Sequence, residues 1–184
     1  LNRKNVKYKT NKIFKKNINF PNPPLNKQND IVIVSRNSKE KKLVETLDLL
    51  NNVLKKKRKV TIIGSYLDKK FDNLQVKYIE RIIERDYYYQ IISTHKVGIL
   101  FSGAEGFGNV IPEYIFCNVW PIVNNCKWGP SETIKKYGVG DVLNWTWEES
   151  RLNILRRTME IENIIDKNYF ISEEIRNLVR KNHQ

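Results

Sequence analysis

The chain has few of the residues that define several large protein classes. Only two of its 184 residues are cysteine, Cys117 and Cys126, too few for a disulfide framework or a cysteine-built zinc site. No apolar run approaches the roughly 18 residues that span a membrane. The spacing Gly-x-Gly-x-x-Gly is absent, which argues against a nicotinamide dehydrogenase. We therefore expect a globular, cytoplasmic protein whose thiols are reduced.

Acidic residues are outnumbered by basic ones, 20 to 33, which gives a net charge of +13. The basic residues concentrate in two runs. Residues 1–29 hold eight of them and no acidic residue, and residues 55–59 read Lys-Lys-Lys-Arg-Lys. Such charge suits anionic partners, nucleic acid among them. Neither run is interleaved with the aromatic residues that stack on bases, so we do not expect nucleic acid to be the partner.

The first part of the chain differs from the rest. Residues 1–29 show little hydrophobic periodicity, and Asn22-Pro23-Pro24 indicates an extended stretch near their end. The chain starts at Leu1 and its only methionine is Met159, so we expect a piece of a longer protein. We interpret residues 1–29 as a basic linker or tail and residues 30–184 as the folded domain.

From residue 31 onward, short apolar runs alternate with stretches of helical spacing. The runs predict strands at 31–34, 60–64, 74–79, 97–101, 120–123 and 139–143. The periodic stretches predict helices at 39–54, 86–94, 109–117, 130–136, 146–165 and 172–181. This alternation indicates an α/β fold, a Rossmann-like parallel sheet flanked by helices, which binds ligands at the carboxyl ends of its strands.

The stretch Ser102–Glu113, SGAEGFGNVIPE, is the most informative in the chain. It runs from the end of a predicted strand through a glycine turn into a predicted helix, the arrangement in which α/β proteins bind phosphates. Glu105 and Glu113 stand eight positions apart, one at each end. A bare pair of acids at this spacing is also typical of an ordinary strand–turn–helix corner with two solvated glutamates.

This stretch resembles the E-x7-E motif of retaining glycosyltransferases of the GT-B fold, in the family usually numbered four and also called glycosyl transferases group 1. The family also has a Gly-Arg dipeptide after its first strand with a lysine five residues later, matched here by Arg36 and Lys41. Ser35 and Lys42 stand where the family has glycine. The run Lys127-Trp128-Gly129-Pro130 resembles a family loop beside the donor site. The resemblance covers roughly residues 30–145.

The resemblance implies that the chain is the donor-binding, C-terminal half of a GT-B enzyme. It implies that Glu105 holds hydroxyls of the donor sugar, that Glu113 accepts from the ribose hydroxyls, and that Arg36 and Lys41 neutralise the diphosphate. By the same resemblance, Gly64 approaches the nucleotide and the backbone of Gly106, Phe107, Gly108 and Asn109 cradles sugar and phosphate.

The resemblance also implies binding partners and the absence of a metal or cofactor. The donor is a nucleotide diphospho-sugar, the acceptor is a glycan, a lipid-linked sugar or another molecule, and a missing N-terminal domain carries most of the acceptor site. We expect no cofactor and no metal, because no Asp-x-Asp triplet is present. We expect the isolated domain to be inactive and its location cytoplasmic, including the cytoplasmic face of a membrane, where a basic surface suits anionic lipid. The basic runs leave one alternative open: a module that binds nucleic acid or an anionic membrane on a degenerate glycosyltransferase fold.

Overall fold

The computed structural model describes residues 13–14, 21, 24, 26–80, 84–126 and 129–184. At its centre lies a six-stranded sheet with the strand order β3-β2-β1-β4-β5-β6. Its strands are β1 (Asn29–Val34), β2 (Arg58–Ile63), β3 (Leu74–Ile79), β4 (His95–Leu100), β5 (Trp120–Asn124) and β6 (Asp141–Leu143). All neighbouring strands are parallel. The expected Rossmann-like parallel sheet is confirmed.

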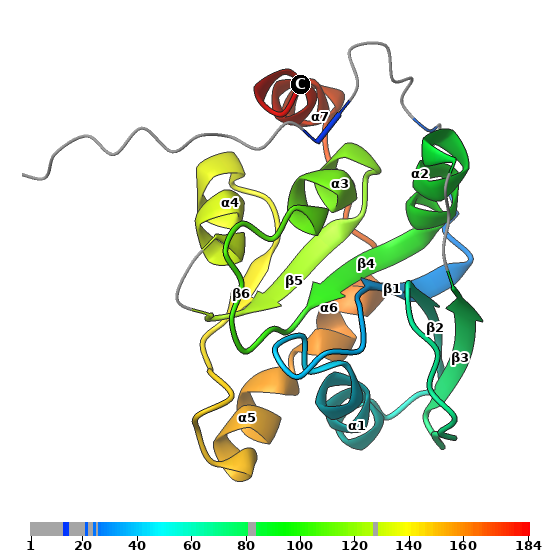
Figure 1. Cartoon of the computed structure of the whole chain (residues 1–184), viewed down its shortest axis with the longest axis vertical. Coiled ribbons are helices and arrows are strands. Elements are labelled where there is room, and N and C mark those ends of the chain that lie inside the picture. Colours follow the sequence, from blue (N-terminus) through cyan, green and yellow to red (C-terminus); the bar gives the residue numbers. More distant parts are fainter. Residues whose placement is uncertain (1–12, 15–20, 22–23, 25, 81–83, 127–128) are drawn as a thin grey trace, which may run out of the picture.

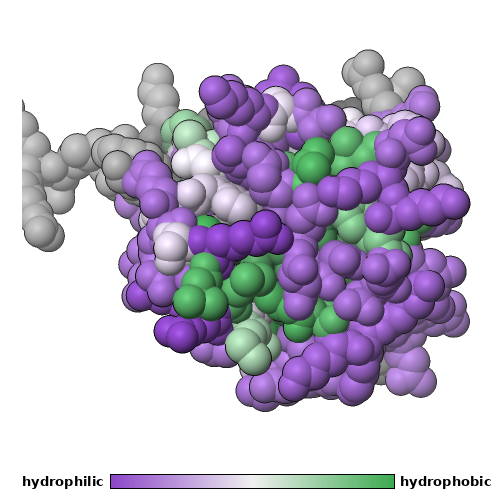
Figure 2. Space-filling model, turned by 90° about the horizontal axis from the view of Figure 1, so that it is seen from below, coloured by the Kyte–Doolittle hydropathy of each residue, from purple (hydrophilic) through white to green (hydrophobic). Residues whose placement is uncertain are grey.

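Helices cover both faces of this sheet, so the molecule has three layers (Figure 1). One layer contains α2 (Arg85–Ser93), α3 (Val110–Phe116), α4 (Pro130–Tyr137) and α7 (Glu173–Asn182). The other contains α1 (Leu43–Val53), α5 (Arg151–Thr158) and α6 (Ile161–Lys167). Figure 2 shows the molecule from below, the side of α1 and α5, where hydrophobic side chains gather across the middle of an otherwise hydrophilic face.

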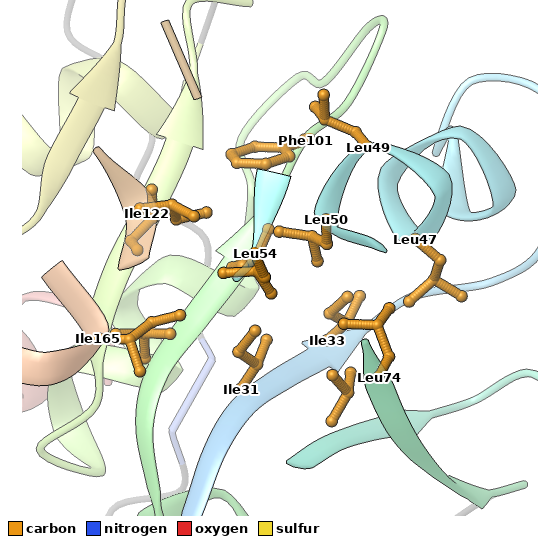
Figure 3. Close-up of a cluster of buried hydrophobic side chains, with 14 of the residues drawn as sticks. Ile31, Ile33, Leu47, Leu49, Leu50, Leu54, Leu74, Phe101, Ile122 and Ile165 are labelled. Atoms are coloured by element: carbon orange, nitrogen blue, oxygen red, sulfur yellow. The ribbon is translucent and has the colours of Figure 1, made fainter. Parts of the chain in front are cut away.

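Each face of the sheet has its own hydrophobic core, and β1 contributes to both. Ile31 and Ile33 pack toward α1, where Leu47 and Leu50 lie over them (Figure 3). Val32, between them in sequence, belongs to the opposite core with the residues of α3. Because successive side chains of a strand point to opposite faces, a strand buried on both faces has to be apolar throughout. This explains the uninterrupted run Ile-Val-Ile-Val.

The predictions of two helices are wrong in part. The helix expected at 39–54 begins only at Leu43. The residues before it form turns, and Lys42 has a left-handed backbone (φ 51°) that a helix does not allow. The helix expected at 146–165 is two helices, α5 and α6. Ser150 caps the first by accepting from the Asn153 N–H, so α5 starts at Arg151, five residues later than expected. A tight turn at Met159–Glu160 then separates α5 from α6.

Phe14 and Lys27, two of the described residues of the segment 1–29, lie against the domain. Phe14 is 4% exposed and its ring lies 4.6 Å from that of Phe116 on α3. The ammonium group of Lys27 donates to the carbonyl of Asn118, and burial lowers the pKa of Lys27 to about 8. Most of the expected basic linker lies outside the described residues, so its interpretation as a linker stays a prediction.

An ionic cluster fastens α6 to the amino ends of the strands. Arg58 at the start of β2 is buried, and its guanidinium contacts Glu162 at 3.2 Å and Asp166 at 2.8 Å. Glu162 also accepts the backbone N–H groups of Lys55 and Lys56, at 3.2 and 3.1 Å. Burial raises the pKa of Glu162, but these amides and Arg58 together outweigh it and hold the pKa below its usual value. The carboxylate is thus stabilised in its ionised form.

We predict that Glu162→Gln lowers the free energy of unfolding by about 1–3 kcal/mol at pH 7, the scale of hydrogen bonds to a charged group. Because the pKa of Glu162 is lower in the folded chain, its contribution is present above the ordinary value of 4.5 and is lost as the pH falls through the folded pKa. Urea unfolding at pH 7 and pH 3 tests this, with the exposed neighbour Glu160→Gln as the control. A cost that is independent of pH would contradict the assignment.

Candidate functional site

A pocket of about 300 Å³ opens at the carboxyl ends of the central strands. It lies where the chain reverses its direction across the sheet, since β1 is flanked by β2 on one side and by β4 on the other. Open α/β sheets bind ligands at such a point. The pocket is lined by Val34, Ser35, Arg36, Lys41, Ile63, Gly64, Leu100, Glu105, Gly108, Asn109 and Val110.

The loop after β1 brings two cations to this pocket. Ser35 is tied to β2 by its N–H, which donates to the carbonyl of Ile63 at 3.0 Å. Arg36 follows at once, is exposed, and lines the pocket together with Lys41. Lys42 takes the left-handed conformation that glycine adopts most readily, and glycine is the residue it replaces in the family pattern. The turn after Lys41 therefore forms without glycine.

The loop after β4 is held against the first loop through the backbone. The carbonyl of Glu40 accepts the N–H of Gly103 at 2.8 Å, and the hydroxyl of Ser102 lies 3.0 Å from the same oxygen. Across this junction the ammonium group of Lys41 forms an ion pair with the carboxylate of Glu105, and both side chains are largely buried. The two groups expected to contact phosphate and sugar separately are thus bound to each other.

The glycine turn between the two acids requires glycine at Gly108. This residue has a positive φ of 58°, and a Cβ there would lie 2.6 Å from Cγ of Pro130 at the start of α4. Any other residue would have to push α4 away and would also strain the backbone. Phe107 points outward and is 51% exposed.

Glu113 occupies the first turn of α3 and is bound to α2. It is 7% exposed. One carboxylate oxygen accepts from Arg85 at 3.0 Å and from the hydroxyl of Tyr89 at 3.5 Å, and the other accepts from the hydroxyl of Tyr88 at 2.7 Å. Burial raises the pKa of Glu113, while the hydrogen bond from Tyr88 and the charge of Arg85 act in the opposite direction. Glu113 therefore joins α2 to α3.

The structure brings together six of the nine expected site residues. Arg36, Lys41, Gly64, Glu105, Gly108 and Asn109 line the pocket. Gly106, Phe107 and Glu113 are not among the described residues that line it, although all three belong to the adjoining turn and helix. Trp128 lies outside the described residues.

Sequence reasoning missed several residues around the site. The apolar floor of the pocket comes from strand ends and the start of α3, namely Val34, Ile63, Leu100 and Val110. Arg85 and Tyr88 bind Glu113, and neither gave a signal of a site in the sequence. Their relation to Glu113 depends on how α2 packs against α3, which no local pattern reports.

The described residues form neither a metal-ligand cluster nor a membrane-spanning helix. Within the ranges given above, no three metal-ligating side chains come together. The absence of a metal from the reaction stays a prediction. No helix of the described part is both long and apolar enough to cross a membrane.

Comparison with known proteins gives one family and several solved structures. The family model described as glycosyl transferases group 1 matches residues 14–154. A structure described as the GtfA/B complex is similar with a TM-score of 0.60 and 14% identity, over 95% of this chain and 39% of that one. The structure of TarM is similar with a TM-score of 0.58 and 18% identity, over 90% of this chain and 34% of that one. No curated protein matches the chain.

A third structure is the pneumococcal O-GlcNAc transferase GtfA in complex with UDP and GlcNAc. Its TM-score is 0.59 at 19% identity, over 85% of this chain and 32% of that one. At these identities the similarity shows the fold, which is that of GT-B glycosyltransferases. The chain spans between 32% and 39% of the length of these three structures.

We predict that Tyr88→Phe lowers the free energy of unfolding by about 1–3 kcal/mol, because a buried carboxylate loses a hydrogen-bond donor. The matched control is Tyr87→Phe, since Tyr87 is the preceding residue and is exposed. Urea unfolding of both variants at pH 7 measures the difference. Equal stabilities would show that Tyr88 contributes nothing to the attachment of α2 to α3.

Proposed function

The chain belongs to the glycosyl transferases group 1 family, and we propose that it is the donor-binding half of a retaining glycosyltransferase. The proposal is carried by one observation: Arg36, Lys41 and Glu105 line one pocket, at the point between β1 and β4 where the strand order reverses. Two cations and one acceptor side by side fit a donor in which a diphosphate adjoins a sugar.

The cations would act on the leaving group. When the bond between sugar and diphosphate breaks, negative charge develops on the diphosphate. A guanidinium and an ammonium already placed there lower the energy of the transition state without the cost of reorganising water. The fork of Arg36 suits two phosphate oxygens at once, and Lys41 supplies a compact point charge.

The acids would act on the hydroxyls of the donor. In this proposal Glu105 accepts from a sugar hydroxyl while the diphosphate draws Lys41 away from it. Glu113 would accept from the ribose hydroxyls. A carboxylate offers about four lone-pair sites, and Arg85, Tyr88 and Tyr89 use three of them. One lone-pair site is thus left for a ligand hydroxyl.

The partners of such a domain follow from its chemistry. The donor is a nucleotide diphospho-sugar, in agreement with the neighbour whose structure contains UDP and GlcNAc. The acceptor and most of its site belong to the other half of a GT-B enzyme, which is why we expect this domain alone to transfer no sugar. A basic module for nucleic acid or an anionic membrane has less support, because a formed pocket with paired charges serves neither.

Titration calorimetry with UDP, GDP and ADP tests the proposal. We expect one of the three to bind, and we expect Arg36→Met to weaken it by about 1.5–3 kcal/mol, roughly ten- to a hundredfold. Lys39→Met, which removes an exposed cation of the same loop, is the control. Binding of none of them, together with salt-sensitive binding of RNA or anionic vesicles, would favour the basic module.

The ion pair between Lys41 and Glu105 generates a second prediction. Glu105→Gln releases Lys41 to the diphosphate, so the affinity for the bound nucleoside diphosphate should rise about two- to fivefold, the scale of a lost ion pair. In a Lys41→Met background the same substitution should have no effect. An equal gain in both backgrounds would mean that Glu105 only repels the phosphates at a distance.

A further inference from the structure

Asn124, the last residue of β5, makes a paired contact with the loop that carries Glu105. Its side chain is buried, with 1% of its surface exposed. The side-chain oxygen accepts the N–H of Ser102 at 3.0 Å, and the side-chain nitrogen donates to the carbonyl of Ser102 at 3.1 Å. The last backbone pairing between β4 and β5 is that of Leu100 with Val123. The carboxamide of Asn124 thus acts as one further peptide group of the sheet.

Ser102 passes this constraint to both loops of the pocket. Its hydroxyl lies 3.0 Å from the carbonyl oxygens of Glu40 and Ala104, the residues that precede Lys41 and Glu105. The N–H of Gly103 donates to the same carbonyl of Glu40 at 2.8 Å. The buried side-chain amide of Asn124 therefore helps to hold the backbone beside Lys41 and Glu105 in place.

We infer that Asn124 is a positioning residue for the diphosphate of the donor, acting through Ser102 on Lys41. This inference rests on the proposed function, because it assigns the group that holds the phosphate-binding loop in place. Neither the glycine turn nor the acid pair contains Asn124. An apolar residue would fill the same space but would leave the N–H and carbonyl of Ser102 without a partner in a buried site, where such groups are costly.

The experiment compares nucleotides that differ by one phosphate. The unmodified chain, Asn124→Ala and Asn124→Leu are titrated with UDP, GDP and ADP and with UMP, GMP and AMP. Leucine nearly keeps the volume of the side chain and loses both hydrogen bonds. The control is Asn118→Gly, which removes a buried amide at the opposite end of β5 and suits the positive φ of 58° at that position.

We expect both Asn124 variants to bind the preferred diphosphate about tenfold more weakly, a change of about 1.4 kcal/mol. Their affinity for the matching monophosphate should stay within about twofold, and Asn118→Gly should alter neither affinity. If Asn124 contributed to stability alone, its variants would have a lower folded fraction and would bind both nucleotides more weakly by the same factor. Equal weakening, or none, overturns the inference and leaves the proposed function intact.

Two further outcomes complete the test. If Asn124 acts through Ser102, the losses of diphosphate affinity caused by Asn124→Leu and Ser102→Ala are not additive in the double variant. Additive losses overturn the inference. If the unmodified chain binds no nucleotide, the proposed function fails and the inference fails with it. Should Asn124→Ala not fold, Asn124→Leu and the double variant decide the question.

Discussion

The position of α3 depends on one tyrosine that reaches through the core to β1. The hydroxyl of Tyr114 accepts the N–H of Val34 at 3.1 Å and lies 3.4 Å from the carbonyl of Val32. Its ring occupies the space above Gly98 on β4, where a Cβ would come within 2.4 Å of it. A buried ring with a satisfied hydroxyl fixes both distance and orientation. Since Tyr114 directly follows Glu113, the same contact places the glycine turn over the ends of β1 and β4.

Ion pairs lie at both ends of the sheet, and they differ in how many partners each charged residue has. At the amino end, Arg58 contacts acidic residues of β1 and α6, and Glu162 is further held by backbone amides. Each acidic residue there has at least two partners, so the cluster is suited to holding α6. At the carboxyl end, Lys41 and Glu105 have each other beside a pocket. A ligand can separate such a pair at a smaller cost in free energy than it could separate the Arg58 cluster, because fewer contacts are lost.

The sequence predicted the features that depend on local pattern. The strands were recognisable because each is a short apolar run buried on both faces, and β3 has the predicted bounds 74–79. The turn with Glu105 and Gly108 was recognisable because its residue types are required by its conformation. Long-range contacts were not predictable. Arg85 meets Glu113 across 28 positions and Asn124 meets Ser102 across 22, and neither pairing leaves a trace in the spacing of residues. The start of α1 was missed because a lysine takes a conformation usually reserved for glycine.

The ion pair in the pocket follows from the chemistry of the proposed donor. A diphosphate bonded to a sugar places strong anions within a few atoms of neutral hydroxyls, so its site needs a cation and a hydrogen-bond acceptor as neighbours. Because both side chains are largely buried, either charge alone would carry a desolvation cost. Paired with each other, Lys41 and Glu105 avoid that cost, and the donor of the proposed function would supply a new partner for each. On this proposal the pair would favour ligands that offer an anion and a hydroxyl together, because a ligand with only one of them would leave the other residue unpaired.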